Sequence, residues 1–378
     1  VQENPDILCL QETKLQPDQY PAEVFEALGY RAYLYSAQKK GYSGVAILTK
    51  QEPDHVEYGM GIEAYDNEGR FIRADFGDLS VVSVYHPSGT SGDERQAFKM
   101  VWLEDFQKYV TELRKTRPNL ILCGDYNICH EPIDIHDPVR NATNSGFLPE
   151  EREWMTRFLS AGFIDSFRLL YPEKQEYTWW SYRFNSRAKN KGWRIDYCMT
   201  SEPVRPMLKS ASILNDAVHS DHCPMALEDR IQKAVELFKS GYNCSQSVVA
   251  AFADMYGFTQ EQAVRMSASF GGGIGRMRET CGAACGLFLI AGLETGATEA
   301  TDREGKAANY AVVQELAAEF KKRNGSLICG ELLGLKKKEP ISTVPEERNT
   351  QYYSKRPCAK MVEEAARIWV EYLEKHPK

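Results

Sequence analysis

Leu120-Ile121-Leu122-Cys123-Gly124-Asp125-Tyr126-Asn127 is an apolar run that ends in an acid and an amide. A short apolar run followed by glycine and polar residues predicts a buried strand. Asp125 and Asn127 would then project to the same side of the extended chain where that strand ends. One of them could handle a proton while the other donates to a phosphate or substrate, although an Asx turn that closes a strand explains this sequence equally well.

Four further polar segments occur at the ends of apolar runs between residues 1 and 228. They are Gln11-Glu12-Thr13-Lys14, Tyr85-His86-Pro87-Ser88-Gly89, Arg194-Ile195-Asp196 and Ser220-Asp221-His222. Side chains at strand ends are presented over a rigid sheet, which is where catalytic groups gather. Hydrolysis of a phosphodiester needs a cation, a group that activates water, and donors to the phosphate oxygens. Together the five segments therefore predict a phosphodiesterase active site.

Glu12 and His222 have the chemistry expected of a metal-assisted hydrolase. A carboxylate such as Glu12 suits Mg²⁺ because hard cations prefer oxygen ligands, yet taken alone Glu12 is better explained as a surface residue. His222 is expected to contact phosphate or water while Asp221 fixes its tautomer or acts on a neighbouring group. Four other histidines lack zinc-ligand spacing and are interpreted as ordinary polar residues: His86, His130, His136 and His219.

Residues 1–228 alternate strand-like and helical segments, whereas residues 229–378 are predicted to be helical. Strands are expected at residues 44–48, 70–76, 80–85, 120–124, 194–200 and 225–227. Helices over residues 98–116 and 149–161 complete a mixed α/β pattern with a two-sheet core. From Asp229 onward apolar residues recur at helical spacing, so two domains are expected, 1–228 and 229–378.

The charge of the chain is distributed unevenly between these halves. Residues 1–228 hold 25 Lys+Arg and 34 Asp+Glu, a net −9, while residues 229–378 hold 21 and 19, a net +2. An acidic half that binds an anionic substrate needs divalent cations among its carboxylates and a local basic patch. No apolar run is long enough to span a membrane and no signal peptide is evident, so a cytoplasmic protein is expected.

An aromatic segment, Thr178-Trp179-Trp180-Ser181-Tyr182-Arg183, is followed by a basic one. The basic side chains of this region are Arg183, Arg187, Lys189, Lys191 and Arg194. Such a loop can stack on a base or fill an abasic gap while its cations meet phosphates. Trp179 is the candidate for substrate contact, whereas Trp180 is expected in the core. Lys336-Lys337-Lys338 is interpreted as a solvated loop rather than a nucleic-acid arm.

These motifs resemble exonuclease III over nearly all of residues 1–228. The resemblance rests on Leu10-Gln11-Glu12-Thr13-Lys14, Gly124-Asp125-Tyr126-Asn127-Ile128, the Thr178–Arg183 segment, Arg194-Ile195-Asp196 and Ser220-Asp221-His222-Cys223-Pro224. The acids and the final Asp-His pair suffice for the broader endonuclease/exonuclease/phosphatase superfamily. Trp179 and the segment ending at Asp196 point to its abasic-site DNA repair branch.

The resemblance implies a four-layered α/β sandwich of the DNase I-like kind. It implies Mg²⁺- or Mn²⁺-dependent cleavage on the 5′ side of abasic sites, with 3′-5′ exonuclease and 3′-phosphatase activities. The implied partner is double-stranded DNA with abasic sites or 3′ ends, and the oligomeric state stays open.

The resemblance also implies a role for each matching side chain. Glu12 and Asp221 correspond to metal ligands, and Trp179 corresponds to the aromatic residue that recognises the abasic nucleotide. Asp125 would activate water or protonate the leaving group, and Asn127 would orient the nucleophile or phosphate. The implied catalytic set is Tyr85, Asp125, Asn127, Asp196, Asp221 and His222, in which His222 contacts the scissile phosphate.

One part of the family pattern has no match in this chain. The family begins with a strand that carries a Trp-Asn-Val-Asn-Gly-like motif, whose asparagine belongs to the metal site, and Val1 comes after that point. The start of the protein is therefore expected to be missing. Loss of a central strand removes ladder hydrogen bonds and part of the core, so reduced stability and activity are expected.

The ten cysteines divide equally between the halves. Those of the first half lie in apolar runs without ligand spacing and are expected to be reduced and buried: Cys9, Cys123, Cys129, Cys198 and Cys223. In the second half, Cys281 and Cys285 share one face if their segment is helical, and a thiol at a helix N-terminus is biased toward thiolate. The glycine run at residues 271–275 lacks the rest of a nucleotide-binding motif. Cys285 is most simply explained as a buried free thiol.

Residues 229–378 resemble the C-GCAxxG-C-C family. The resemblance rests on Asn243-Cys244-Ser245-Gln246, Cys281-Gly282-Ala283-x-x-Gly286, Cys329 with Gly330, and Cys358-Ala359-Lys360. It implies a small all-helical domain with a redox or metal-binding role for Cys244, Cys281, Cys329 and Cys358. Either a disulfide or a metal such as zinc or an Fe–S cluster is compatible with these cysteines.

Two other functions remain open from the sequence. The first is a different phosphoesterase of the same superfamily that acts on nucleotides or lipid head groups. The second is an inactive nuclease scaffold whose working part is a thiol redox or metal-binding module.

Overall fold

Residues Asn119–Asp125 form β7, a central strand of a six-stranded sheet in the order β4-β5-β6-β7-β9-β8. The other strands of this sheet are β4 (His55–Tyr58), β5 (Phe71–Phe76), β6 (Leu79–Tyr85), β8 (Phe163–Asp165) and β9 (Asp196–Ser201). β6 and β7 run parallel, and the other neighbours are antiparallel. The ends of β6 and β7 therefore meet the start of β9 at one edge of the sheet.

A second, antiparallel sheet has the order β1-β3-β2. Its strands are β1 (Ile7–Gln11), β2 (Arg31–Tyr35) and β3 (Val45–Thr49). Val45 and Ile47 of β3 pack with Ile72 and Ala74 of β5, which forms the core between the two sheets. The alternate residues of β3 pack on the opposite side, near Phe25. Both faces of β3 are covered, so the strand is buried along its whole length and is apolar from Val45 to Leu48.

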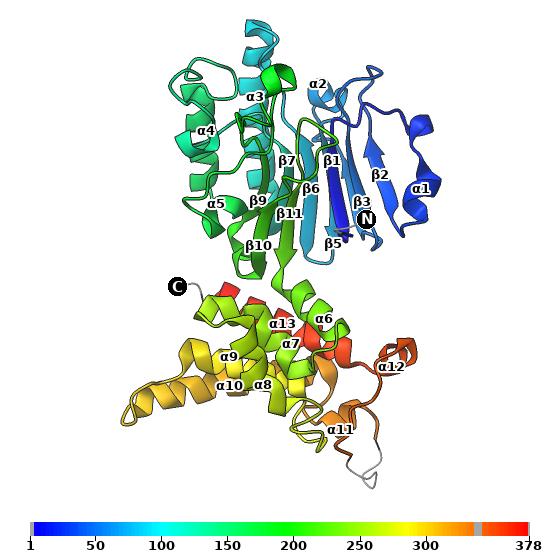
Figure 1. The fold of residues 1–378 in the computed structure, drawn as a ribbon, viewed down its shortest axis with the longest axis vertical. Helices are drawn as coiled ribbons and strands as arrows, with labels where there is room; N and C mark the ends of the chain where they lie inside the picture. Colours follow the sequence, from blue (N-terminus) through cyan, green and yellow to red (C-terminus); the bar gives the residue numbers. More distant parts are fainter. Residues whose placement is uncertain (1–3, 336–341, 377–378) are drawn as a thin grey trace. The chain divides into compact units, whose positions relative to one another are not determined.

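Helices cover the outer faces of the two sheets (Figure 1). α3 (Asp93–Leu113) and α4 (Pro149–Ser160) pack on the six-stranded sheet through a core that includes Trp102, Phe106 and Phe158. The short α1 (Ala22–Glu26) lies beside the other sheet, and α2 (Glu63–Asp66) and α5 (Ser166–Leu170) are single turns. A small sheet of β10 (Leu208–Ile213) and β11 (Met225–Asp229) packs with α5. The four-layered α/β sandwich is confirmed.

The expected helix over residues 98–116 begins and ends earlier in the structure, at Asp93 and Leu113. Its first turn is polar and carries Asp93 and Glu94, so apolar spacing alone does not reveal it. Acidic side chains in a first turn are stabilised by the positive end of the helix dipole.

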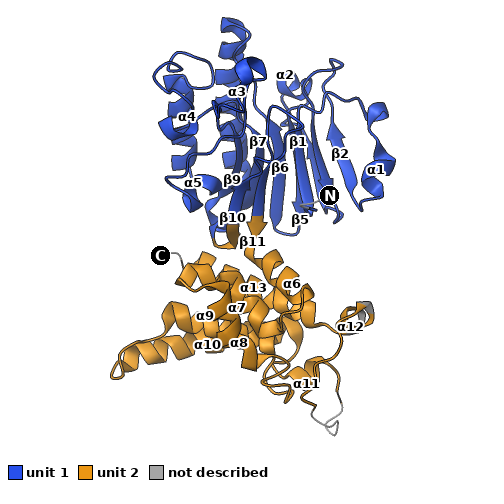
Figure 2. Cartoon of the chain, viewed as in Figure 1, with its two compact units in different colours: residues 1–205, 210–227 blue, residues 206–209, 228–378 orange. Residues whose placement is uncertain are grey.

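The computed structural model describes residues 4–335 and 342–376, so the Lys336-Lys337-Lys338 run lies outside the described residues. The chain divides into unit 1, Val1–Arg205 with Ser210–Leu227, and unit 2, Pro206–Lys209 with Glu228–Lys378 (Figure 2). The division therefore passes through β10 and β11.

Unit 2 is built from helices around one apolar core that includes Phe238, Phe252 and Trp369. Its helices are α6 (Arg230–Lys239), α7 (Cys244–Phe252), α8 (Gln260–Ser267), α9 (Gly282–Thr295), α10 (Arg303–Asn324), α11 (Cys329–Leu332), α12 (Thr350–Lys355) and α13 (Cys358–Lys375). None of the helices that the structure describes has the length and apolar character needed to cross a bilayer.

A fully buried ion pair joins the two helices that cover the six-stranded sheet. Lys99 of α3 lies 2.5 Å from Glu151 of α4, and both side chains are inaccessible to solvent. The Lys99 ammonium also donates to the Asn127 carbonyl at 2.8 Å, and Glu151 accepts from the Gly146 and Leu148 backbone N–H groups. The pair thus ties the segment after β7 to the helical layer.

We expect Lys99→Met to destabilise unit 1 by about 3–5 kcal/mol, because the buried Glu151 charge loses its partner. Calorimetry of the full chain resolves the unfolding transitions of the two units. It would measure the change in the transition temperature of unit 1. The matched control is Lys108→Met on the same helix, where the side chain is exposed. The double variant Lys99→Met/Glu151→Leu should regain part of the loss, because no buried charge is left unpaired. Equal transition temperatures for the Lys99 and Lys108 variants would contradict this role.

Candidate active site

Three predicted site residues lie in one row across the six-stranded sheet. In the strand register, Tyr85 at the end of β6 pairs with Asp125 at the end of β7, and Asp125 pairs with Asp196 at the start of β9. Directly paired residues of neighbouring strands point to the same face of a sheet. The backbone ladder itself therefore places these three side chains next to one another.

Glu12 reaches this row from the second sheet. It follows β1, and its carboxylate accepts a hydrogen bond from the Tyr85 hydroxyl at 2.8 Å and pairs with Lys14 at 2.6 Å. The two sheets are joined nearby, where the Gln11 side chain donates to Ser83 at 2.8 Å. Glu12 has a φ of 49°, a left-handed backbone conformation that turns the chain sharply after the strand.

Asp125 and Asn127 form a compact unit at the end of β7. The Asn127 backbone N–H donates to Asp125 at 2.7 Å, and its side-chain amide donates to the other carboxylate oxygen at 3.1 Å and to the His86 carbonyl at 3.0 Å. This is an Asx turn, and it also orients the Asp125 carboxylate. The structural and the catalytic explanations of this segment are thus compatible.

His222 pairs with Asp196 rather than with Asp221. Its Nδ1 lies 2.9 Å from the Asp196 carboxylate, whereas Asp221 accepts a hydrogen bond from the Trp179 indole at 3.0 Å. The expectation that Asp221 fixes the His222 tautomer was wrong, because neighbouring residues of an extended segment point apart. Asp221 positions Trp179 instead.

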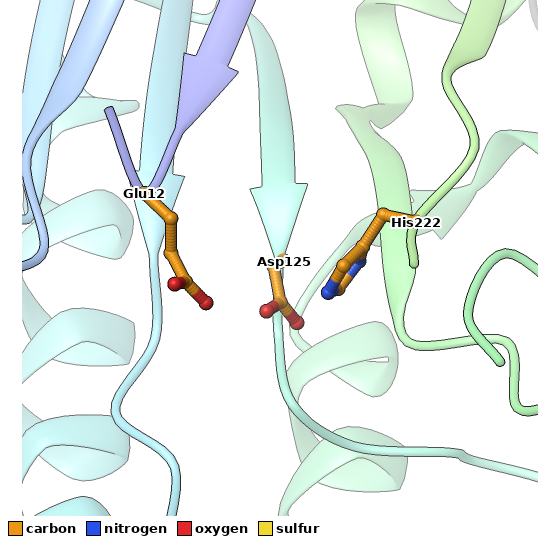
Figure 3. A group of neighbouring side chains, drawn as sticks. All are labelled: Glu12, Asp125 and His222. Atoms are coloured by element: carbon orange, nitrogen blue, oxygen red, sulfur yellow. The ribbon is translucent and has the colours of Figure 1, made fainter. Parts of the chain in front are cut away.

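Glu12, Asp125 and His222 converge on one space (Figure 3). One ligand atom of each lies within 4.8 Å of the others, and among the described residues this is the one group of three or more such side chains close enough to share an ion. Two carboxylates offer the oxygen atoms that a hard divalent cation prefers. The donor set fits such a cation. The structure groups Asp125 and His222 with Glu12, and Asp221 lies outside this group.

The charges of the three groups differ. Burial and the nearby Asp196 carboxylate raise the pKa of Asp125 to about 8. Burial lowers the pKa of His222, but the ion pair with Asp196 outweighs it and raises this pKa to about 10. For Glu12, burial by itself would raise the pKa, but hydrogen bonds from Lys14 and Tyr85 hold this pKa below its ordinary value. Near neutral pH the site thus contains an anion, a cation and a carboxyl group able to hold a proton.

The aromatic and basic segment after β8 forms an irregular loop beside the site. Trp179 is half-buried and Trp180 is buried, as expected, and Arg183, Lys189 and Lys191 are exposed. Arg187 stacks on Trp180 and donates to the Ser220, Asn215 and Ala217 carbonyls, so it joins this loop to the one that precedes Asp221.

Arg194 does not belong to the basic surface. Its side chain is fully buried and pairs with Asp134 at 2.8 Å and with Asp165 at 2.7 Å. The expectation that it contacts DNA was wrong, because the ion pairs and the Tyr197 ring enclose the guanidinium.

Tyr182 and Phe184 are two aromatic residues that sequence reasoning missed. Their exposed fractions are 77% and 85%, and Phe184 has a left-handed backbone with a φ of 61°. The sequence feature that could have indicated them is that these aromatic residues stand among cationic residues and do not belong to an apolar periodic pattern. A protruding aromatic side chain between cations offers a stacking surface for bases.

The four predicted cysteines of unit 2 lie around one cavity of about 310 Å³. Cys244 and Cys358 are partly exposed, whereas Cys281 and Cys329 are buried. Cys285 does not line the cavity, and it is a buried free thiol, as expected.

Comparisons with known proteins divide the chain in the same way. Residues 242–372 match the family described as "Putative redox-active protein (C_GCAxxG_C_C)". The chain is 47% identical over 227 residues to an exodeoxyribonuclease of Bacillus subtilis, and this alignment covers 60% of this chain and 88% of that protein. It is 46% identical over 228 residues to the DNA repair nuclease APEX1 of Danio rerio, covering 60% and 73%.

Solved structures agree with these sequence comparisons. The 3′ phosphatase NExo from Neisseria, bound to a product DNA hairpin, aligns with a TM-score of 0.56 and 30% identity over 60% of this chain and 89% of that one. An AP endonuclease from Archaeoglobus fulgidus aligns with a TM-score of 0.57 and 30% identity over 60% and 90%. Residues 1–222 match the Endonuclease/Exonuclease/phosphatase family, and the chain belongs to that family through this segment.

Proposed function

We propose that residues 1–228 form a DNA repair nuclease that hydrolyses the phosphodiester on the 5′ side of abasic sites and also acts at 3′ ends as an exonuclease and phosphatase. The observation that carries the proposal is the convergence of Glu12, Asp125 and His222 beside the Asp196 carboxylate. The relatives named as an exodeoxyribonuclease and a DNA repair nuclease support the same reaction.

Double-stranded DNA is the proposed substrate. A basic and aromatic loop borders an otherwise acidic half, and its exposed cations suit phosphates while its aromatic side chains suit bases or an abasic gap. Trp179 is held by Asp221 at the edge of the site, where it can contact the abasic nucleotide. Tyr182 and Phe184 extend the same surface.

Each side chain of the site has a role that follows from its charge and contacts. His222, charged and held by Asp196, stabilises negative charge on the scissile phosphate. Asp125 holds or releases the proton that passes between water and the leaving oxygen, and Asn127 keeps its carboxylate oriented. Tyr85 fixes Glu12 through its hydroxyl and stays neutral, because burial and Asp125 raise the pKa of this phenol.

Mg²⁺ is the proposed cofactor, with Mn²⁺ as the alternative. Glu12 would hold it, Asp125 and His222 border the same space, and the cation would supply charge neutralisation at the phosphate and a more acidic bound water. Asp221, expected as a ligand, would act through Trp179 and the orientation of the loop.

A second function is proposed for unit 2, a redox or metal-binding role for its cysteines. The specific observation in its favour is that Cys244, Cys281, Cys329 and Cys358, which are far apart in sequence, line one cavity.

We expect Asp125→Asn to slow incision of a duplex with a single abasic site by about 10²–10⁴-fold, the usual contribution of a general acid or base. Single-turnover cleavage with saturating enzyme and Mg²⁺ measures the chemical step apart from binding. Asp18→Asn, at an exposed position outside the site, is the matched control. Incision by the Asp125 variant at the wild-type rate would refute the assignment.

We expect EDTA to abolish incision and added Mg²⁺ to restore it, because the carboxylates would repel the phosphate without a cation. Glu12→Gln should raise the Mg²⁺ concentration needed for half-maximal rate, since it removes one ligand charge. The exposed Glu23→Gln variant provides the comparison. A rate that is unchanged by EDTA would rule out the metal-assisted reaction.

We expect Lys189→Gln/Lys191→Gln to weaken DNA binding and to reduce the slope of log affinity against log salt by about 2, one unit for each phosphate contact. Fluorescence anisotropy with a labelled duplex at several salt concentrations measures the slope. The matched control is Lys108→Gln/Lys115→Gln, which removes two exposed cations from α3 and from the turn after it. If both pairs change the slope equally, the loop is not the DNA-binding surface.

A further inference from the structure

The cavity of unit 2 is lined by cysteines from separate helices. Cys244 is the first residue of α7, Cys358 is the first residue of α13, and Cys281 is the N-cap of α9. The positive ends of these three helices therefore face one cavity. A thiol in such a position is biased toward the thiolate, and an anion in the cavity is stabilised in the same way.

The cavity wall is also strongly cationic. Among the described residues, Arg276, Arg278, Arg348 and Arg356 line it together with one acid, Glu346, so these five side chains carry a net +3. Glu346 is shared among Arg276, Arg278 and Arg356. One carboxylate cannot neutralise three guanidinium groups, so the cavity retains a positive field.

The loop that contributes two of these arginines has an unusual backbone. Arg276 and Arg278 have φ values of 64° and 66°, a left-handed conformation that side chains other than glycine rarely adopt. Backbone strain of this kind persists where the surrounding structure requires a given side-chain direction. Here both guanidinium groups border the cavity.

The neighbouring Gly282 allows α7 and α9 to approach closely. A Cβ at this position would lie 2.8 Å from the Phe270 carbonyl oxygen and 3.3 Å from the Cys244 Cβ. A larger residue would therefore push the helix start that carries Cys244 away from the cavity.

Cys358 and Cys244 differ from the other two cysteines. Each is the first residue of its helix and lines the same cavity, and the neighbouring Cys244 thiol, with the charges of Arg356, Arg278 and Arg348, lowers the pKa of the Cys358 thiol to about 7. The neighbouring Cys358 thiol and burial raise the pKa of Cys244, and burial raises the pKa of Cys281 to about 12. Cys358 is thus the natural nucleophile, and Cys244 is the thiol within reach of it.

The four sulfurs are not arranged around a single metal ion. In the described part of the chain, no three cysteines lie close enough together to share one, in contrast to Glu12, Asp125 and His222. A pair of thiols that line one cationic cavity corresponds better to thiol–disulfide exchange than to a closed tetrahedral site.

We propose that Cys358 and Cys244 form a redox dithiol that reduces small anionic disulfides bound in this cavity, an assignment that rests on the redox role proposed for unit 2. The Cys358 thiolate attacks one sulfur of the substrate, which forms a mixed disulfide and releases one thiolate. Cys244 loses its proton and attacks the Cys358 sulfur, which closes the Cys244–Cys358 disulfide and releases the second thiolate. The dithiol loses two electrons to the substrate, and the protons that Cys358 and Cys244 lose on forming thiolates pass through solvent to the two released thiolates.

The test begins with the reduced full chain and three disulfide probes: anionic dithiodiglycolate, neutral hydroxyethyl disulfide and cationic cystamine. For each probe, the rate at which the protein loses thiols is divided by the rate at which free mercaptoethanol reacts with the same probe. This division corrects for the different intrinsic reactivities of the three disulfides. We expect the normalised rate to be at least about tenfold higher for the anionic probe than for the cationic one at low salt. Peptide mass mapping should identify a Cys244–Cys358 bond in the wild-type chain.

Variants separate the two thiols and the charges. Cys244→Ser should stop at a mixed disulfide on Cys358, and Cys358→Ser should not react, whereas Cys285→Ser should behave like the wild type. Arg278→Gln/Arg356→Gln should remove the preference for the anionic probe, and Arg265→Gln, at an exposed position away from the cavity, should keep it. Circular dichroism checks folding, and the mass map of the wild-type chain does not depend on any variant.

The outcomes distinguish this assignment from the broader proposal. A disulfide between another pair, or equal normalised rates for the three probes, would leave a redox role for unit 2 and overturn this one. A metal bound by the four thiols in the chain as isolated, found by elemental analysis, would also overturn it. If all ten thiols stay free with every probe and no metal is present, both proposals for unit 2 fall, while incision of abasic DNA remains a separate readout.

Discussion

The candidate active site of unit 1 depends on the strand register of β6, β7 and β9. Because Tyr85, Asp125 and Asp196 are direct partners in this ladder, backbone hydrogen bonds hold their side chains in one row. A shift of one residue in any strand would turn its site residue to the opposite face of the sheet. Glu12 from the second sheet and His222 from a loop then attach to this row through Tyr85 and Asp196. The sheet thus fixes the positions of the side chains in the row, and the segments outside its strands contribute Glu12 and His222.

Buried charges serve the structure around this site in two places. Lys99 pairs with Glu151 and holds the Asn127 carbonyl, and Arg194 joins Asp134 to Asp165 immediately before Asp196. Both groups are inaccessible to solvent, so they cannot meet DNA. They fix the two chain segments that carry Asn127 and Asp196 of the candidate site, and a buried charge without its partner is costly. Lys99 and Arg194 therefore serve the fold, whereas Arg183, Lys189 and Lys191 are exposed on the loop.

Unit 2 places its chemistry at helix N-termini instead of strand ends. Cys244, Cys281 and Cys358 stand at the starts of three helices, and arginines occupy the gaps between them. Both units thus use the ends of regular elements, where side chains are well positioned and backbone groups remain free to interact. They differ in the groups that they gather: the site of unit 1 offers carboxylate oxygens that suit a cation, and the cavity of unit 2 is lined by guanidinium groups that suit an anion.

The sequence by itself determined the elements and the candidate residues, because periodicity and motifs are local properties. The strand before Asp125 and the helical second half follow from spacing along the chain, and the set of four cysteines follows from the resemblance to a known family motif. Only the tertiary structure decided which side chains meet. Asp221 and His222 are adjacent in sequence but have different partners, since Asp196 comes to His222 across the sheet edge. Arg194 belongs to a basic segment but is buried, and Cys244 and Cys358 line one cavity although more than a hundred residues separate them. Partners of this kind depend on strand register and helix packing, which bring distant residues together and which no local pattern encodes.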